Sequence, residues 1–456
     1  MKIAIFVLAD MFVPLMLSTG NCLEQHHGHQ VRYLNFLPHD HKLLASNTDQ
    51  LYPRNLETLD GSKEEASTLF SPDEVKEMVG FMQTKHGGSL NEWHGRVNTV
   101  ARYVHRFLDE QQPELFVVWN GQDHIGQIIT ILCRRRGITV VYLENGYFAN
   151  TLQADLGGVN ASATLASMDF DAVLAQARSQ TAAAAAEKAA PSLHLRPLTR
   201  TQLAAIALAH RANLSYYAQY PEQRGFSRIK TWKIKRQRAA IANDEATLPA
   251  QFAFIPLQVH DDTQVLLNSK LVHSVEEFFE TVHAAIRRTC GPDYPIIVKE
   301  HPEDLGRYDY SQLRQKYPDV LWLRKFDVEL LLDRATMVFV INSSVGLQAI
   351  RRKKPTVVLG ESFYSKPEIA FVVKRLDQLD ATVQRAAAGV DEQMSARIDD
   401  FLDALDRTLF VKGTWKHPAC LQAGPALAER LLALHARSRK AAITAHATSH
   451  QRIGNV

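Results

Sequence analysis

The chain has 456 residues, 46% of them hydrophobic and 22% charged, with a formal net charge of +3 at pH 7. This composition is typical of a globular protein, and so small a charge gives no indication of a nucleic-acid partner. Because a chain of this length exceeds what one hydrophobic core usually fills, we expect two domains. The four cysteines lack any metal-ligand spacing, which predicts buried free thiols and neither a disulfide framework nor a zinc site.

The N-terminus carries an apolar run at 3–17 that imitates a secretory signal. Asp10 interrupts this run, so a first strand at 2–8 followed by a helix to about Gln25 explains it better. No other stretch approaches the roughly 20 apolar residues that a membrane-spanning helix requires. We therefore expect a cytoplasmic protein, either free or peripheral at a membrane.

An alternation of strands and helices continues through the first third of the chain. It predicts strands at 29–36, 114–120 and 139–144, and helices within 71–112 and at 125–136. This βαβ rhythm is typical of a doubly wound, Rossmann-like domain. Three histidines between 26 and 29 adjoin Gly28, and a solvated turn at the helix end explains them better than a metal site does.

The middle of the chain is less regular. Residues 166–190 are rich in alanine, and helical periodicity returns at 202–219 after a break. Seven cations then alternate with apolar and aromatic residues between Arg224 and Arg238. Such a segment could dock to an anionic membrane surface, although a solvated basic helix would have the same composition.

A second alternation of strands and helices begins at Phe252. It predicts strands at 252–257, 295–298, 320–323, 337–341 and 356–359, with helices at 273–289, 309–316, 328–334 and 345–352. Continuous apolar strands between helices indicate a parallel sheet covered on both faces. We expect an α/β protein of two Rossmann-like domains with an interdomain cleft, an N-terminal domain at 1–240, a C-terminal domain at 241–435 and a disordered tail at 436–456.

Polar segments follow three of the later strands, at 258–264, 299–302 and 342–346. Ligands in open α/β sheets bind beyond the carboxyl ends of the strands, so these segments are candidates for one shared site. In the third segment, Ser343 and Ser344 precede a helix, where hydroxyl and backbone N–H groups could bind an anion. A simple capping serine would also explain that segment.

The other two segments carry candidate catalytic groups. His301 could hold a phosphate or protonate a leaving phosphate oxygen, or it could be an ordinary surface residue. Asp261 and Asp262 form a carboxylate pair, of which at most one is expected to enter the site, because adjacent residues in extended backbone point to opposite sides. A carboxylate there could act as nucleophile, base or metal ligand. No DxD-type motif accompanies it, which favours a mechanism without a metal.

A further candidate lies in the first half of the chain. Glu144 follows a predicted strand and could act as a general acid or base. The segment 119–124 ends the preceding strand. Both segments contain Asn-Gly and could equally be turns.

Taken together, the acidic-x-Gly segment at 144–146, His-Pro at 301–302 and Ser-Ser at 343–344 resemble the motif set of bacterial transferases that use CMP-activated acidic sugars. The strings ENGYFANTLQADLGGVNA, FIPLQVHDDTQV, KEHP and INSSVGLQAI resemble the capsule polysaccharide biosynthesis family, and within it the KpsS-like β-Kdo transferases. The resemblance spans about residues 110–370.

The resemblance implies a GT-B fold, CMP-Kdo as the donor with no further cofactor or metal, and transfer of Kdo with retention to a phosphatidylglycerol-type lipid. It maps the nucleophile of a Gln-x-x-x-Asp segment onto Asp262, the acid/base onto Glu144, and a catalytic and phosphate-binding histidine onto His301. Asn145 stands where a second acid often appears, so the acid/base role rests on Glu144 alone. The residues expected to bind the donor are Gln258, Lys299, His301, Asn342, Ser343, Ser344 and Gly346.

The expected partners are a CMP-sugar, a lipid or lipid-linked glycan acceptor, the inner face of the cytoplasmic membrane and other capsule assembly proteins. Two alternatives stay open. One is an inverting transferase for CMP-sialic acid with Glu144 as the base, and the other is a noncatalytic factor for capsule assembly or export. Turnover of each CMP-sugar and binding of CMP would distinguish the three hypotheses.

Overall fold

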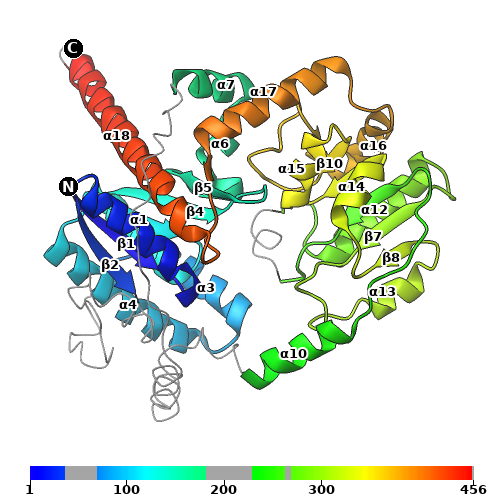
Figure 1. Ribbon diagram of the computed structural model, residues 1–456, viewed down its shortest axis with the longest axis horizontal. Helices are drawn as coiled ribbons and strands as arrows, with labels where there is room; N and C mark the ends of the chain where they lie inside the picture. Colours follow the sequence, from blue (N-terminus) through cyan, green and yellow to red (C-terminus); the bar gives the residue numbers. More distant parts are fainter. Residues whose placement is uncertain (36–68, 181–227, 262–268, 454–456) are drawn as a thin grey trace. The chain divides into compact units, whose positions relative to one another are not determined.

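The computed structural model describes residues 1–35, 69–180, 228–261 and 269–453. These residues form two compact units, each built around its own six-stranded sheet (Figure 1). The first unit contains described residues 1–35, 69–159 and 409–453, and the second contains 160–180, 228–261 and 269–408. The expected α/β class with two Rossmann-like sheets is therefore confirmed.

The first sheet has the strand order β12-β5-β4-β3-β1-β2. Its strands are β1 (Lys2–Val7), β2 (Gln30–Asn35), β3 (Leu115–Trp119), β4 (Thr139–Asn145), β5 (Thr151–Asp155) and β12 (Phe410–Lys412). The first four strands in the chain pair in parallel, whereas β5 pairs antiparallel with β4 and β12 antiparallel with β5. The β1 and β3 strands are buried along nearly their whole length, as expected for a sheet covered on both faces.

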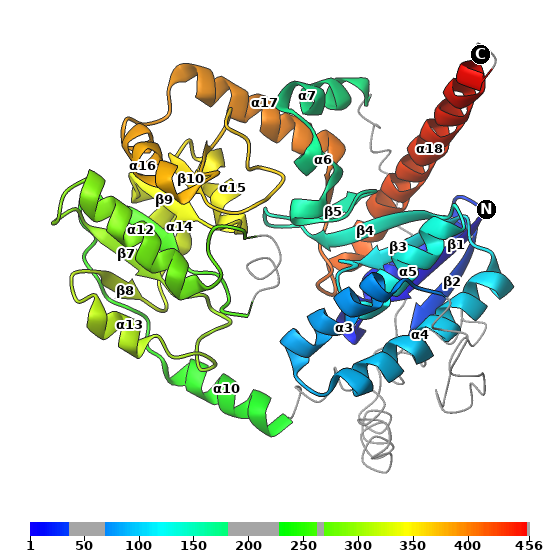
Figure 2. The same cartoon turned by 180° about the vertical axis from the view of Figure 1, so that it is seen from behind.

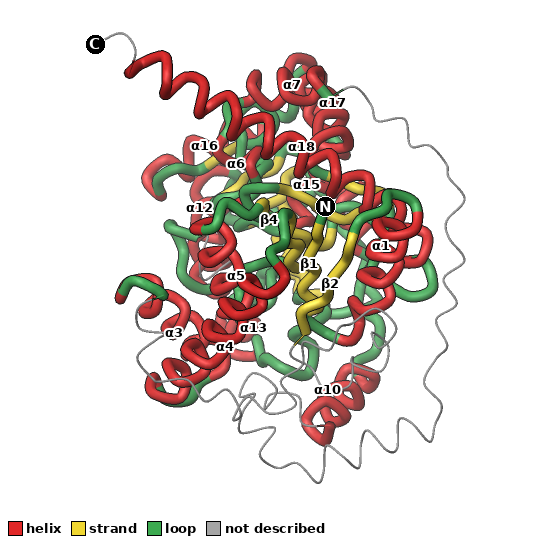
Figure 3. The backbone as a smooth tube through the Cα atoms, turned by 90° about the vertical axis from the view of Figure 1, so that its left-hand side faces the viewer, coloured by secondary structure: helices red, strands yellow, loops and turns green. Residues whose placement is uncertain are grey.

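Helices cover both faces of the first sheet. They are α1 (Val13–Gln25), α3 (Pro72–His86), α4 (Leu90–Gln111), α5 (His124–Arg135) and α18 (Cys420–Ile453). The α1 helix lies against β1 and β2, and it also packs along α18 (Figure 3). Buried side chains such as Val13, Leu427 and Leu431 join these two helices to the sheet. A second core formed by α3, α4 and α5 lies on the opposite face.

The course of α18 corrects two expectations about the C-terminal region. The helix continues to Ile453, so the tail expected to be disordered is helical up to that residue. Residues 409–453 also belong to the first unit, so the C-terminal domain does not extend to 435 as expected. The cause is packing: Leu427, Leu431 and Leu434 are buried against the first sheet's core.

The second sheet is parallel throughout and has the order β11-β10-β9-β6-β7-β8. Its strands are β6 (Ala253–Pro256), β7 (Ile296–Lys299), β8 (Leu321–Leu323), β9 (Met337–Val340), β10 (Thr356–Val358) and β11 (Phe371–Val372). From β6 the chain builds outward through β7 and β8, and it then resumes on the other side of β6 with β9. The strand order therefore reverses between β6 and β9, which is where doubly wound sheets bind ligands.

Helices surround the second sheet. They are α10 (Arg228–Ala240), α12 (Val275–Thr289), α13 (Ser311–Lys316), α14 (Val328–Arg334), α15 (Ser344–Arg351), α16 (Leu379–Ala387) and α17 (Glu392–Thr408). Two helices from earlier in the chain, α6 (Thr164–Ser167) and α7 (Phe170–Ser179), also belong to this unit, and α7 packs along α17 (Figure 2). The rings of Phe170 and Phe401 stack there at a centroid distance of 6.1 Å. The expected domain boundary at 240 is therefore wrong, since 160–180 and 228–240 lie in the second unit.

Several other expectations can be compared with the described residues. All four cysteines are free thiols; three are buried, and Cys290 is half-buried. No helix in the described ranges combines the length and hydropathy needed to cross a membrane. The predicted helix at 202–219 and the first four residues of the basic segment, 224–227, lie outside the described residues.

Candidate active site

Two amide side chains connect the strand ends where the order of the second sheet reverses. Gln258 follows β6, Asn342 follows β9, and both side chains are buried. Gln258 Nε2 donates to Asn342 Oδ1 at 3.0 Å, and the backbone N–H of Asn342 donates to Gln258 Oε1 at 3.2 Å. Two of the predicted donor-binding residues are thus in direct contact, and they fix the edge of the sheet where a ligand is expected.

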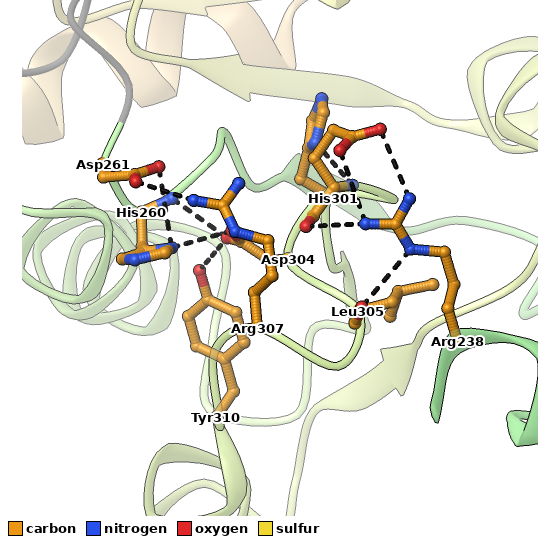
Figure 4. Close-up of polar contacts among 9 residues, drawn as sticks. Arg238, His260, Asp261, His301, Asp304, Leu305, Arg307 and Tyr310 are labelled. Carbon is orange, nitrogen blue, oxygen red and sulfur yellow. Dashed lines mark hydrogen bonds and ion pairs between the residues drawn. The ribbon is translucent and has the colours of Figure 1, made fainter. Parts of the chain in front are cut away.

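A buried carboxylate holds the loop that follows β6. Asp304 is 0% exposed, and its Oδ2 accepts from the backbone N–H of His260 at 3.0 Å and from the Tyr310 hydroxyl at 2.9 Å. The Nδ1 atom of His260 lies 2.8 Å from Asp304 Oδ1 (Figure 4). On its other side, the His260 ring stacks on Tyr308 with centroids 4.4 Å apart. Sequence reasoning placed His260 in a candidate segment without giving it a role, and it missed Asp304, which looks like an ordinary loop residue.

The expected nucleophile cannot be placed beside these groups, because Asp262 lies outside the described residues. Its neighbour Asp261 is half-exposed and pairs with Arg307 at 2.7 Å. His260, Asp261 and Asp304 bring ligand atoms within 4.8 Å of one another, a spacing that could suit a cation. However, Arg307 already supplies the positive charge beside Asp261, and both oxygens of Asp304 accept hydrogen bonds from the protein. This donor set is therefore a poor fit to a metal ion.

His301 holds the turn that follows β7. Its Nδ1 accepts from the backbone N–H of Glu303 at 3.1 Å, and its carbonyl accepts from the N–H of Asp304 at 3.0 Å. An accepting Nδ1 carries no proton, so the ring proton of the neutral imidazole lies on Nε2. The same turn is attached to α10, because Arg238 donates to the carbonyls of Glu303 at 3.0 Å and Leu305 at 3.4 Å (Figure 4).

The two residues before His301 are both buried charges. Burial raises the pKa of the Glu300 carboxyl, and an ion pair with Arg314 opposes that effect. Burial lowers the pKa of the Lys299 ammonium, while Asp244 and Glu300 partly oppose the change. A buried lysine with a lowered pKa at a strand end is a functional candidate, although structural ion-pair networks perturb pKa values too.

A pocket of about 310 Å³ lies beside Glu300. It is bordered by α10 and by the loops that follow β7 and β8. The lining includes three arginines, Arg307, Arg314 and Arg324, together with the acids Glu300 and Asp309. Guanidinium groups bind carboxylates and phosphates with two parallel hydrogen bonds, and two of these arginines already pair with protein carboxylates, Arg307 with Asp261 and Arg314 with Glu300.

The Ser-Ser segment begins α15. Ser343 is the capping residue, because its Oγ accepts from the backbone N–H of Val345 at 3.1 Å. The hydroxyl of Tyr364 donates to the Ser343 carbonyl at 2.6 Å. A Cβ at Gly346 would lie 2.6 Å from the hydroxyl oxygen of Tyr364, so close packing requires the glycine. The capping interpretation is confirmed for Ser343, while an anion-binding role for Ser343, Ser344 and Gly346 stays a prediction.

Glu144 ends β4 in the first unit. Its Oε2 accepts from Asn120 Nδ2 at 2.5 Å, and its Oε1 accepts from the backbone N–H of Asn145 at 2.8 Å. Trp415 Nε1 donates to Asn145 Oδ1 at 2.5 Å. Because β4 and β5 pair antiparallel, the segment from Glu144 onward enters a hairpin, as the turn interpretation predicts. These hydrogen bonds fix the orientation of the Glu144 carboxylate at the end of the strand.

The chain is similar to proteins of capsule polysaccharide synthesis. A family model described as capsule polysaccharide biosynthesis protein matches residues 114–386, more than half of the chain. Protein FixF of Sinorhizobium fredii is 29% identical over 183 residues, which cover 40% of this chain and 42% of that protein. The capsule polysaccharide export protein KpsS of Escherichia coli is 24% identical over 162 residues, 34% of this chain and 41% of that protein.

The matched segments therefore span less than half the length of these two relatives. Among solved structures, the Thermosulfurimonas dismutans KpsC β-Kdo 2,7 transferase matches with 15% identity and a TM-score of 0.35. That match covers 66% of this chain and 89% of the other.

Proposed function

The chain belongs to the capsule polysaccharide biosynthesis protein family, the family of glycosyltransferases that its motifs resemble, and from that premise we propose that it is a retaining Kdo transferase. The proposed donor is CMP-Kdo, and the proposed acceptor is a phosphatidylglycerol-type lipid that starts the capsule linker. One observation carries the proposal. The polar residues that follow β6 and β9 meet at the Gln258–Asn342 bridge, where the second sheet reverses its order, and those that follow β7 lie at the end of the strand next to β6.

The charges at this edge support an anionic donor. The N-terminus of α15 and the hydroxyl of Ser344 would bind the CMP phosphate, since helix N-termini favour negative charge. His301 would donate a hydrogen bond from Nε2 to the same phosphate. The arginine-lined pocket beside Glu300 would suit the carboxylate of an acidic sugar.

The proposed reaction has two steps, each of which inverts the anomeric centre, so that the configuration is retained overall. In the first step, the Asp262 carboxylate attacks the anomeric carbon, the bond to the phosphate oxygen breaks, and CMP leaves. In the second step, the acceptor hydroxyl attacks the same carbon, Asp262 is released, and Glu144 takes the proton of the hydroxyl. The amide hydrogen bonds to Glu144 support this role because they orient the carboxylate.

The deciding experiment offers the protein CMP-Kdo or CMP-sialic acid with a panel of lipid acceptors, and it measures CMP release and the product mass. We expect CMP release from CMP-Kdo and a product carrying one added Kdo. Turnover of CMP-sialic acid with no turnover of CMP-Kdo would instead support the inverting alternative. Asp262→Asn should abolish transfer and keep CMP binding, and normal turnover by this variant would remove Asp262 from the mechanism.

A noncatalytic role has one observation in its favour, because the Escherichia coli relative is described as an export protein. Binding of CMP separates this hypothesis from the proposed one. A ligand that binds only the folded state raises apparent stability, by about 2.7 kcal/mol at a concentration 100 times its Kd. We expect CMP to raise the melting temperature, and no shift at saturating CMP would favour the assembly factor.

We also propose that α10 docks to the inner face of the cytoplasmic membrane. Trp232 is 58% exposed, Lys233, Lys235 and Arg236 are exposed around it, and Arg238 fixes the helix to the second unit. Exposed cations attract anionic lipids, and an exposed indole inserts at the interface. The protein should co-sediment with phosphatidylglycerol vesicles and not with phosphatidylcholine vesicles. Lys233→Glu with Lys235→Glu should release it, whereas equal binding to both vesicle types would argue against docking through charge.

A further inference from the structure

Two histidines follow adjacent strands of the second sheet, and their Nδ1 atoms have opposite hydrogen-bond roles. His301 Nδ1 accepts from the N–H of Glu303, so it carries no proton. His260 Nδ1 faces the Asp304 carboxylate at 2.8 Å, and a carboxylate can only accept, so this atom carries the proton. The atom of His260 that can gain and lose a proton is therefore Nε2, whereas Nε2 of His301 serves as a donor.

Two contacts fix the position of the His260 ring, one with the Asp304 carboxylate and one with Tyr308. Asp304 is fully buried, and hydrogen bonds from the His260 backbone and the Tyr310 hydroxyl prevent its carboxylate from turning. Tyr308 stacks on the ring. The ring keeps 26% of its surface exposed, and no described residue makes a hydrogen bond to Nε2. A histidine whose Nδ1 is held by a carboxylate while Nε2 remains accessible is arranged as a proton carrier.

The charged groups around His260 come from several elements. Asp304 belongs to the loop after β7, while Asp261 is on the same loop as His260, with its Oδ1 4.0 Å from Nδ1. Asp261 is itself paired with Arg307. The Tyr308 hydroxyl is hydrogen-bonded to Glu276 at the start of α12, which raises the pKa of Tyr308 to about 12. The tyrosine is therefore neutral near pH 7, and the buried carboxylate is the partner that stabilises a positive charge on the ring.

We propose that His260 is the proton-transfer residue of this site and that Asp304 and Tyr310 position it. With the substrate taken from the proposed function, the bond between the anomeric carbon and the phosphate oxygen breaks, and its electron pair goes to that oxygen. Nε2 of the charged imidazole donates its proton there, while the nucleophile of the proposed function forms the new bond to carbon. His260 is then neutral, and it regains a proton from water before the next turnover. His301 contributes a hydrogen bond and transfers no proton.

The pH profile of kcat for CMP release from CMP-Kdo tests this proposal. His260→Gln should lower kcat by about 100-fold and remove the limb of the profile that falls as pH rises, because the acid is gone. His283→Gln is the matched control, since His283 also pairs with an aspartate, Asp319, but lies on α12. That variant should keep the wild-type profile. If His260→Gln kept this limb, the proposal would be overturned.

Two further variants separate positioning from a purely structural role. Asp304→Asn should move the falling limb to lower pH, because the imidazolium loses its charged partner. Tyr310→Phe should move it by less and to higher pH, because the carboxylate loses a hydrogen-bond donor and attracts the imidazolium more strongly. Thermal unfolding and CMP affinity are measured in parallel. A loss of melting temperature in both variants without any shift of the limb would show that Asp304 and Tyr310 are only structural.

A readout without substrate keeps this test distinct from that of the proposed function. Nitrogen-15 chemical shifts of the imidazoles report which ring nitrogen carries the proton. In the full-length protein we expect a protonated Nδ1 and a titrating Nε2 at His260, and a protonated Nε2 at His301. The opposite assignment would overturn the inference even if CMP-Kdo were the substrate. If the nitrogen-15 shifts agreed with this assignment but CMP-Kdo were not turned over, His260 would remain the proton carrier and the proposed substrate would be rejected.

Discussion

The two sheets hold their strand-end carboxylates in different ways. In the first unit, Glu144 accepts hydrogen bonds from the neutral amides of Asn120 and Asn145. In the second unit, Glu300 is buried and paired with the guanidinium of Arg314. Neutral donors orient a carboxylate and leave its charge available, whereas an arginine neutralises that charge and fixes the side chain. Under the proposed function, proton transfer belongs to Glu144, and the ion pair with Arg314 gives Glu300 a structural role although it directly precedes the His-Pro motif.

The strongest test of this contrast replaces each acid by its amide. Glu144→Gln should lower the rate of transfer by about 1000-fold, within the range that general acid–base groups contribute. Its melting temperature should change little, because an amide can still make hydrogen bonds to Asn120. Glu300→Gln, measured in the same assay, should lower the rate by less than about tenfold. Equal losses of transfer rate in Glu144→Gln and Glu300→Gln would contradict the different roles of the two acids.

Unfolding in urea tests the ion pair between Arg314 and Glu300. Arg314→Met should lower the free energy of unfolding by about 3 kcal/mol at pH 7, because Glu300 remains as a buried charge without its partner. Arg314 opposes the rise in the pKa of Glu300 that burial causes, so in this variant that pKa rises further. The folded state then favours the protonated acid. The loss should be largest above the raised pKa and should shrink as pH falls through it.

Arg288→Met provides the matched control, because Arg288 pairs with Asp380 in the same unit but is exposed. Removing an exposed pair should cost less than about 1 kcal/mol. If Arg314→Met and Arg288→Met lowered the free energy of unfolding equally, the burial of Glu300 would not depend on its ion pair with Arg314.

Lys299→Met should have a smaller effect, raising the stability of the fold and weakening the binding of the donor. Burial lowers the pKa of Lys299, so the fold disfavours its charged form. A base with a lowered pKa costs stability wherever the unfolded chain is protonated, which extends to about pH 10. Methionine should therefore raise the free energy of unfolding by about 1 kcal/mol at pH 7, and the gain should fade toward pH 10. If Lys299 binds the donor, calorimetry should also show weaker CMP binding, and unchanged affinity would remove it from the donor site.

The smallest expected effect concerns the support behind Glu144. Trp415→Phe removes the indole hydrogen bond to Asn145, which in turn holds Glu144. One hydrogen bond is worth about 1 kcal/mol, so kcat should fall by about fivefold with little change in KM. Trp322→Phe serves as the control, because its indole donates to a backbone carbonyl in the second unit. Similar kcat values for the two variants would mean that Asn145 does not depend on Trp415.

Several elements escaped prediction for identifiable reasons. The β5 strand, TLQAD, alternates polar and apolar residues, and its Gln153 donates to the carbonyl of Asn145. Its short, partly polar sequence looks like a loop, and only pairing with β4 makes it a strand. The end of α18 lost its apolar periodicity, yet alanine and arginine favour helix by intrinsic propensity. Absence of an apolar stripe predicts exposure, not disorder.

The sequence by itself determined the α/β class, the parallel second sheet and the polar segments at its strand ends. Apolar runs and turn residues are local signals, and the carboxyl ends of parallel strands always meet at one edge. Only the tertiary structure decided that Asp304 holds His260 from 44 positions away, that Arg314 pairs with Glu300, and that residues 409–453 return to the first unit. These pairings depend on burial and on directed hydrogen bonds between distant parts of the chain, and no local pattern of residues encodes them.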